Sequence, residues 1–326
     1  MDSPITQLNE PWGLGRISHQ GPENTSWPYL YSTLGQGDGV DVYVLDTGIL
    51  AEHEEFKGRV AEGHSVIPDE DTILDFNGHG THCAGTVAGT TFGVAKKATI
   101  VPMKVLSRMG VGGGAFLTKG MQWVRSRHLD KVKNGTAGFR GSVVSMSLGA
   151  EKDTVVNRWA TVLAKEGIHL VAAAGNERTD ACAKSPASSP NVTTVGAVDR
   201  NDEFAGAFSN FGSCVDVHAP GVEITSASNV NKTGSFTASG SSMACPHVAG
   251  VLATLLSRQA GDDEATILTK ITPRQLKTDL LWITTKGVIG RDGLPANTTD
   301  TIVYSGGSKT NYSEILDRGG WPECCM

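Results

Sequence analysis

The sequence lacks a long apolar run, an excess of positive charge and any internal repeat. None of its apolar segments approaches the roughly 18 residues that cross a bilayer as a helix, and its N-terminus has no basic segment followed by an apolar one, the pattern of a secretory signal peptide. The formal net charge is −6, which gives no attraction to nucleic acid or to an anionic membrane surface. We therefore expect neither as a partner.

Nothing in the composition divides the chain into parts. No change of composition or run of charge marks a second domain, and 39% of the 326 residues are hydrophobic, which is enough for one large core. The 40 glycines gather at turns without a fixed period, which excludes a collagen-like chain. We predict one domain over residues 1–306 and a disordered tail over residues 307–326.

Apolar, β-branched segments alternate with helical patterns along the chain. Strands are predicted at residues 40–46, 100–106, 142–148, 169–174, 193–198 and 215–219. Helices are predicted at residues 115–127, 153–165, 243–257 and 273–285, the last with Thr272 as its N-cap. This alternation is typical of an α/β fold with a central, mostly parallel sheet flanked by helices.

A serine stands where a turn of small residues meets an apolar helix, in Gly-Ser-Ser-Met-Ala-Cys-Pro-His-Val-Ala-Gly at residues 240–250. Ser242 would be exposed there, beside the unpaired N–H groups of the first helical turn. Because a serine hydroxyl alone is a weak nucleophile, it needs a base and a group that orients the base.

Both groups are available upstream of the serine. His79 lies between two glycines in Asn-Gly-His-Gly-Thr-His-Cys-Ala-Gly at residues 77–85, and Asp46 ends an apolar strand just before a glycine turn. Open α/β sheets hold their active sites at the carboxyl ends of strands. The order Asp, His, Ser is one of three in which this triad is found.

With these three motifs in this order, the chain resembles the subtilisin-like serine proteases from about residue 11 to residue 307. The resemblance is strongest to the proteinase K branch and its cerevisin-type vacuolar members. It implies a three-layer α/β fold and a serine endopeptidase that acts through an acyl-enzyme intermediate. It makes Asp46 the orienting acid, His79 the general base, Ser242 the nucleophile and Asn176 the amide of the oxyanion hole.

The resemblance also implies how a polypeptide substrate binds, as a strand added between residues 110–112 and 147–149. The implied contact residues are Gly110, Gly112, Ser147, Leu148, Gly149, Ala173 and Gly175. A primary pocket lined by Leu148 and residues 172–175 would carry no charge, so we expect broad specificity with a preference for large apolar or aromatic residues before the cut. Where the family usually has threonine, this chain has Ser241.

Two structural features are implied in the same way. One is a disulfide between Cys182 and Cys214. The other is a structural Ca²⁺ held by the carbonyls of Pro190 and Val192 and the carboxylate of Asp216, since oxygen ligands suit this ion. The alternative for Asp216 is pairing with backbone N–H groups alone. The chemistry itself requires no cofactor.

Cys83 and Cys245 follow the two catalytic motifs closely, and we interpret both as small buried hydrophobic residues. The state of Cys324 and Cys325 stays open.

Three other interpretations compete with a serine protease. Residues 110–115 fit a G-x-G-x-x-A pattern with Asp130 downstream, which resembles a dinucleotide fingerprint. His79, His82 and His247 offer ligands for a zinc hydrolase, although H-x-x-H without the intervening glutamate is a weak signal. An inactive member of the same fold would act as a binding module.

Asn-X-Ser/Thr sequons point to the secretory pathway, at Asn24, Asn134, Asn191, Asn231, Asn297 and Asn311. Proteins of the family are made with a signal peptide and an inhibitory pro-segment, neither of which is recognisable here. We therefore expect the chain to be a mature form or a truncated gene model. We expect a monomer that is secreted or resides in the vacuolar lumen.

Overall fold

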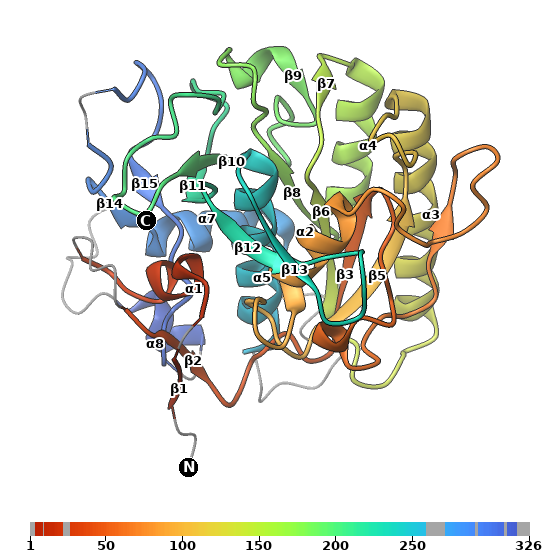
Figure 1. Cartoon of the computed structure of the whole chain (residues 1–326), viewed down its shortest axis with the longest axis horizontal. Coiled ribbons are helices and arrows are strands. Elements are labelled where there is room, and N and C mark those ends of the chain that lie inside the picture. The colour runs from red at the N-terminus through yellow and green to blue at the C-terminus, as the bar shows by residue number, and fades with distance from the viewer. Residues whose placement is uncertain are drawn as a thin grey trace.

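The fold is described from a computed structural model, for residues 4–8, 10–21, 27–258, 271–290, 293–309 and 312–317. Within these ranges a nine-stranded sheet runs through the centre, in the order β14-β15-β11-β10-β8-β6-β3-β5-β4 (Figure 1). Its strands are β3 (Val40–Asp46), β4 (His64–Ser65), β5 (Thr99–Lys104), β6 (Gly141–Met146), β8 (His169–Ala173), β10 (Thr193–Val198), β11 (Val217–Pro220), β14 (Thr285–Lys286) and β15 (Thr301–Ile302). Neighbouring strands are parallel except β14 and β15.

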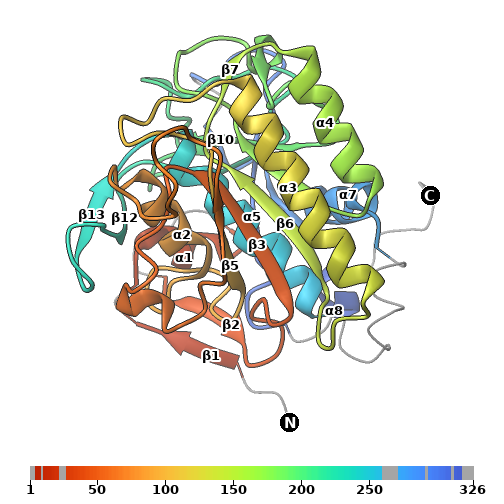
Figure 2. The ribbon, with the colours of Figure 1, turned by 90° about the vertical axis from the view of Figure 1, so that its right-hand side faces the viewer.

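Helices cover both faces of this sheet. On one face, α2 (His79–Ala88) and α5 (Ser241–Ser257) pack against β3 through Val42 and Val44. On the other, α3 (Gly114–Lys133) packs against β3, and α4 (Thr154–Lys165) packs against β8, in a core that includes Tyr43 and Leu45 (Figure 2). Because successive side chains of a strand point to opposite faces, one apolar strand serves both cores. The predicted three-layer α/β architecture is confirmed.

Predicted elements agree with the observed ones to within a few residues. β3 and β10 have the predicted bounds, whereas α3 continues to Lys133, beyond the predicted end at residue 127. The helix predicted after Thr272 is α7 (Pro273–Ile283), and the Thr272 hydroxyl accepts a hydrogen bond from the Gln275 N–H at 3.1 Å, so the predicted cap is confirmed.

Short peripheral elements were not predicted. They are three strand pairs, β1 (Pro4–Gln7) with β2 (Tyr29–Ser32), β7 (Ala150–Glu151) with β9 (Lys184–Ser185) and β12 (Ile224–Ala227) with β13 (Ser235–Ala238), together with α1 (Trp12–Ile17), η1 (Glu54–Phe56) and η2 (Ala181–Ala183). These elements are too short to show a hydrophobic period, and two of the strand pairs, β1 with β2 and β7 with β9, join segments more than 20 residues apart.

The predicted disorder of the tail is corrected for residues 312–317. Tyr312–Leu316 form helix α8, whose Ile315 is buried, and the Tyr312 hydroxyl donates to the Asp279 carboxylate on α7 at 2.7 Å. One apolar and one aromatic side chain are enough to hold this short helix against α7. Asn311, Cys324 and Cys325 lie outside the described residues.

The cysteines of the core and of the surface differ as predicted. Cys182 and Cys214 form a disulfide, and Cys83 and Cys245 are free and fully buried. On a chain-entropy model, closing a loop of this length stabilises the fold by about 3–4 kcal/mol.

Among the described helices, none is both long enough and apolar enough to span a bilayer.

Candidate active site

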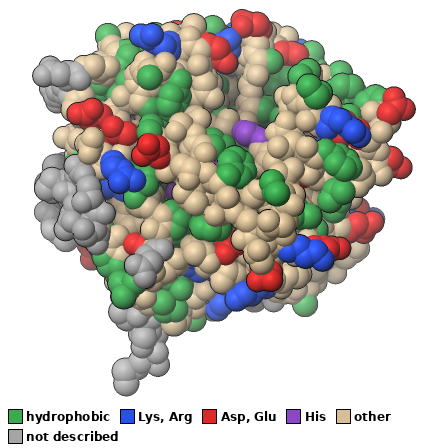
Figure 3. Space-filling model, viewed as in Figure 1, with side chains coloured by type: hydrophobic (Ala, Val, Ile, Leu, Met, Phe, Trp, Pro, Cys, Tyr) green, Lys and Arg blue, Asp and Glu red, His purple; other side chains and the backbone are tan. Residues whose placement is uncertain are grey.

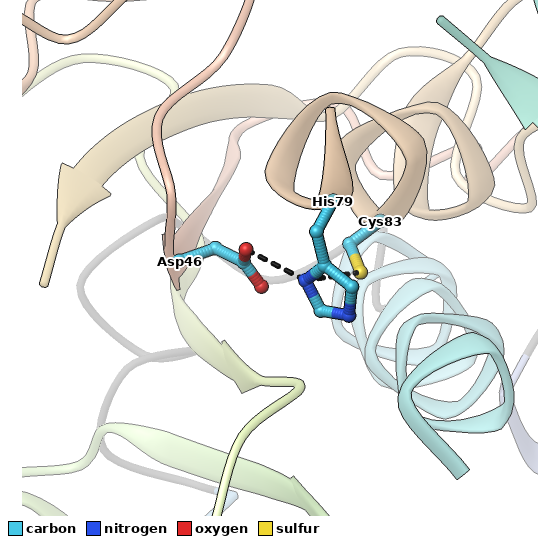
Figure 4. Close-up of side chains that lie close together, drawn as sticks. All are labelled: Asp46, His79 and Cys83. Atoms are coloured by element: carbon cyan, nitrogen blue, oxygen red, sulfur yellow. Dashed lines mark hydrogen bonds and ion pairs between the residues drawn. The ribbon is translucent and has the colours of Figure 1, made fainter. Parts of the chain in front are cut away.

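The centre of the site is a contact between the last residue of β3 and the first residue of α2. Asp46 Oδ1 lies 2.7 Å from Nδ1 of His79 (Figure 4). Asp46 is 1% exposed, whereas the His79 side chain is 28% exposed. The Thr47 N–H donates to the same Asp46 oxygen at 2.8 Å. With Nδ1 facing a carboxylate, the ring proton belongs on Nδ1, which leaves Nε2 as the acceptor.

The surroundings of His79 act on its basicity in opposite directions. Burial disfavours the imidazolium and by itself would lower the pKa of His79, but the Asp46 carboxylate and the Cys83 side chain together outweigh burial and raise that pKa well above its ordinary value of 6.5. The ring is thus made a stronger base than a free imidazole.

Ser242 lies in the first turn of α5, and the Cys83 thiol contacts both it and the histidine. Cys83 Sγ is 3.5 Å from the Ser242 carbonyl oxygen and 3.9 Å from His79 Nδ1. The Ser242 hydroxyl itself donates to the Ser147 carbonyl at 3.1 Å. Through Cys83 the backbone of Ser242 lies near the imidazole, and among the described residues the Ser242 hydroxyl bonds to the carbonyl just after β6 and makes no hydrogen bond to the ring. Apo active sites often have such loosely aligned hydrogen bonds, which tighten when a substrate binds.

Asn176 is oriented by the residue just before the serine. Its Oδ1 accepts hydrogen bonds from the N–H and the hydroxyl of Ser241, at 2.8 and 2.9 Å. Because both donors face Oδ1, the Nδ2 group points away from them as a free donor. Gly240, with φ of 158°, allows this approach, since a Cβ there would lie 3.3 Å from Asn176 Nδ2. Ser241 thus supplies a hydroxyl at the position where the resemblance implied a threonine.

Asp46, Ser147 and Asn176 lie at or just beyond the carboxyl ends of β3, β6 and β8. These three strands are neighbours in the sheet. The sheet itself therefore positions all three groups, as expected for an open α/β fold.

A buried carboxylate that sequence reasoning missed supports this arrangement. Asp75 accepts from the Thr47 hydroxyl at 2.9 Å, from the Asn77 and Gly78 N–H groups, and from both the N–H and hydroxyl of Thr81. Asp75 thereby ties the turn after Asp46 to the first turn of α2. The only signal in the sequence is an aspartate shortly before a helix, which is too common to single out.

A second unpredicted group is Lys104 at the end of β5, which is completely buried. Its ammonium pairs with Glu70 at 3.0 Å and donates to the Thr47 carbonyl. A backbone hydrogen bond from Arg108 and the Lys104 charge keep the pKa of Glu70 below its ordinary value. This buried pair thus also holds the turn after Asp46, through the Thr47 carbonyl.

Replacing Asp75 by asparagine should destabilise the fold by about 2–4 kcal/mol, because an amide NH₂ would then face N–H and O–H donors inside the protein. Urea unfolding followed by circular dichroism measures the loss. The matched control is Asp71→Asn, at an exposed carboxylate four residues earlier, which should change the free energy of unfolding by less than about 0.5 kcal/mol. Equal effects of the two changes would contradict the assignment.

Both predicted substrate segments line one groove of about 460 Å³, which also reaches His79. The wall includes Gly110, Gly112, Ser147, Leu148 and Gly149, with apolar contributions from Val105, Leu106, Val111, Leu117 and Val156. The glycine at 110 has φ of 71°, a left-handed conformation that suits a residue without Cβ.

A smaller pocket adjoins Ser242 and is lined by Leu148, Ala173 and Gly175, as predicted. The prediction that its lining carries no charge is wrong, because Glu177 and Lys184 also contribute. Both charges have partners: Lys184 pairs with Glu151 at 2.6 Å, and Glu177 accepts from the Asn210 amide at 2.8 Å. Sequence reasoning missed them because they come from segments beyond the strand that forms the wall.

The three predicted calcium ligands converge, but the group at their centre is a lysine. The Pro190 and Val192 carbonyls and the Asp216 carboxylate all accept hydrogen bonds from the Lys277 ammonium. The alternative of backbone pairing also holds in part, since the Thr194 N–H donates to Asp216 at 2.8 Å.

The geometry disfavours both competing cofactor sites. Among the described residues, one group of three His, Cys, Asp or Glu ligand atoms lies within 4.8 Å of one another, and it is Asp46, His79 and Cys83. His82 and His247 instead bond to backbone carbonyls, and burial lowers the pKa of each to about 4. Asp130, the acid of the dinucleotide pattern, lies within α3 and not at the end of the next strand.

Charges of both signs are mixed over the face of the molecule that Figure 3 shows. Lys and Arg side chains lie among Asp and Glu side chains, without a broad patch of one sign among the residues described on that face (Figure 3). A histidine side chain is visible near the middle of the same face.

The chain is similar to known proteins over nearly its whole length. The model of the subtilase family matches residues 37–302. A subtilisin-like protease of Coccidioides posadasii is 44% identical over 98% of this chain and 65% of its own length, and alkaline protease 2 of Aspergillus fumigatus is 42% identical over 98% and 65%. A subtilisin-like serine protease of Cochliobolus lunatus is 44% identical over 98% of this chain and 63% of its own length. The chain thus spans a little under two thirds of each of these relatives.

A solved structure agrees with the sequence comparison. The crystal structure of a cold adapted subtilisin-like serine proteinase superposes with a TM-score of 0.79, at 37% identity, over 91% of this chain and 98% of that one.

Proposed function

Because the chain belongs to the subtilase family, we propose that it is a serine endopeptidase in which Ser242 is the nucleophile, His79 the general base and Asp46 the acid that orients the base. The observation that carries this proposal is the 2.7 Å contact between a buried Asp46 and a half-buried His79, at the edge of a groove that leads to Ser242. An inactive binding module would not need a histidine whose pKa is raised, as that of His79 is.

The proposed reaction begins when the Ser242 hydroxyl rotates from the Ser147 carbonyl toward His79 Nε2. The oxygen attacks the peptide carbonyl while Nε2 takes the proton, and Asp46 stabilises the imidazolium. The imidazolium then protonates the leaving amine, and an acyl-enzyme remains on Ser242. Water, deprotonated by the same ring, hydrolyses the acyl group and restores the serine.

Charge that develops on the carbonyl oxygen needs donors held ready for it. Asn176 offers Nδ2, because its Oδ1 is held by Ser241, and Ser242 offers its N–H at the start of α5. Donors that need no reorganisation stabilise a transition state strongly; such an amide contributes about 2.7–4 kcal/mol in subtilisin, a relative of this chain.

A fluorescent phosphonate that reacts with serine hydrolases should label the active protein, and Ser242→Ala should remove the label, since the alcohol that forms the covalent bond is gone. The measurement is in-gel fluorescence on protein that circular dichroism shows to be folded. Ser126→Ala, at an exposed position of α3, is the matched control and should still be labelled. Labelling of folded Ser242→Ala, or inhibition of the wild type by a zinc chelator alone, would contradict the proposal.

The pH dependence of kcat/KM should reflect the raised pKa of His79. Only the neutral ring can take the serine proton, so activity should rise with pH through an apparent pKa above 6.5 and be lost below it. Asp46→Asn removes the charge that raises the pKa, so the same limb should move to lower pH while kcat falls by about 10⁴-fold. An unchanged limb in this variant would show that another group titrates.

We propose that the substrate binds as an extended strand between residues 110–112 and 147–149, with broad specificity and a preference for large apolar or aromatic residues before the cut. The support is the apolar wall of the groove and the fact that Glu177 and Lys184, the two charges beside Ser242, have partners.

Peptides that differ only in the residue before the cut test this preference. Leu, Phe or Tyr should give a kcat/KM at least about tenfold above that of Asp or Lys, because a charged side chain would lose water without gaining a partner. The series is measured by release of a fluorescent leaving group. A higher rate with Lys or Asp would show that Glu177 or Lys184 is free to pair with substrate.

We also propose a monomer that passes through the secretory pathway to the vacuole or the exterior, after removal of a pro-segment. The disulfide supports an oxidising compartment. Of the described sequons, Asn134, Asn231 and Asn297 are exposed and accessible to glycosylation, whereas the Asn191 amide donates to the Thr161 hydroxyl.

A further inference from the structure

The three oxygens expected to bind Ca²⁺ surround a positive charge that belongs to the chain. Lys277 Nζ lies 2.7 Å from the Val192 carbonyl oxygen, 2.7 Å from Asp216 Oδ2 and 3.3 Å from the Pro190 carbonyl oxygen. We call these three oxygens the oxygen cup. An ammonium group has three N–H donors and no acceptor, so the cup uses its full hydrogen-bonding capacity.

A calcium ion and this ammonium group cannot share the cup. Ca²⁺ binds its oxygen ligands at about 2.3–2.6 Å. The three oxygens of the cup already lie within hydrogen-bond distance of Lys277 Nζ. An ion bound to all three would therefore overlap Nζ. Two positive groups at such a separation would also repel each other with little water between them. The residues present therefore do not fit a bound metal while Lys277 keeps this position.

The fold places Lys277 by means of the helix on which it stands. Helix α7 packs against the core through Leu276 and Leu280, which are fully buried, and Thr272 caps its start. The side chains of Lys277 and Asp216 are each about 20% exposed. The lysine thus reaches the cup from a rigid helix, and the contact joins α7 to the segments that precede β10 and β11.

The carboxylate of the cup depends on this charge. Burial raises the pKa of Asp216, and the Lys277 ammonium and the Thr194 N–H oppose that rise. Without Lys277, the three oxygens of the cup would face one another, and the Thr194 N–H would remain as the donor to Asp216. Such an unpaired set costs folding free energy unless another cation fills it.

We propose that the ammonium of Lys277 takes the place of a structural cation in the oxygen cup, so that α7 is attached without Ca²⁺, and that shortening this side chain converts the cup into a Ca²⁺ site. The proposal concerns folding stability and does not depend on the catalytic assignment.

Thermal unfolding in EDTA and in millimolar CaCl₂ tests it, on protein inactivated with phenylmethylsulfonyl fluoride to prevent self-digestion. Lys277→Ala should lower Tm in EDTA by about 3–6 °C. CaCl₂ should restore most of that loss, because an ion that binds only the folded state raises its stability. Calorimetric titration of this variant should find one more bound Ca²⁺ than in the wild type.

Three variants separate the cup from other effects. Lys277→Met keeps the length of the side chain but removes its charge, so it should be destabilised in EDTA and gain no more from CaCl₂ than the wild type. Lys277→Ala combined with Asp216→Asn should lose the added calcium response. Arg274→Ala, at an exposed position of the same helix, should leave Tm unchanged.

Two results would overturn the proposal. One is a Ca²⁺-dependent rise of Tm in the wild type that Asp216→Asn abolishes, because it would mean that the cup binds the ion while Lys277 is present. The other is a calcium response of folded Lys277→Ala no larger than that of the wild type. If Lys277→Ala does not fold, the wild type is compared with Asp216→Asn. The proposal requires CaCl₂ to change the Tm of both proteins equally, and a smaller change in Asp216→Asn would contradict it.

Discussion

The site depends on a carboxylate at the end of one strand meeting an imidazole at the start of a helix. Asp46 is almost fully buried, and a buried charge is tolerated only when it is paired and hydrogen-bonded. The Nδ1–H group of His79 and the Thr47 N–H both donate to its Oδ1, whereas Oδ2 has no hydrogen-bond partner among the described residues. The same contact orients the ring and contributes to its raised pKa, so the requirement for folding and the requirement of the proposed catalysis are met by one interaction.

Around this contact, polar groups inside the protein hold the turn that follows β3. Asp75 reaches it from the loop before α2, and Lys104 reaches it from β5. Each buried group finds partners in segments that the sheet brings together, and removing one partner would leave others unsatisfied. Asp75 and Lys104, both buried, therefore help to position a third buried ionic group, Asp46, because each of them bonds to Thr47, the residue that follows it.

The motif residues were predictable because each carries its own local signal. Glycines flank His79, a strand ends at Asp46, and small residues surround Ser242, so type and order were enough to assign the three roles. The supporting residues have no such signal. Asp75 and Lys104 look like ordinary charges in sequence, and Lys277 looks like an exposed lysine of an amphipathic helix, although it bonds to a carbonyl 85 residues away.

The sequence by itself determined the alternation of strands and helices, the buried faces and the chemical identity of the proposed catalytic groups, because these follow from local hydrophobic period and from residue type. Only the tertiary structure decided which polar groups satisfy one another: Ser241 with Asn176, Asp75 with two turns, and a lysine in an oxygen cup that sequence reasoning had assigned to calcium. Hydrogen bonds and ion pairs act over a few ångströms, and only folding brings residues from distant segments within that range.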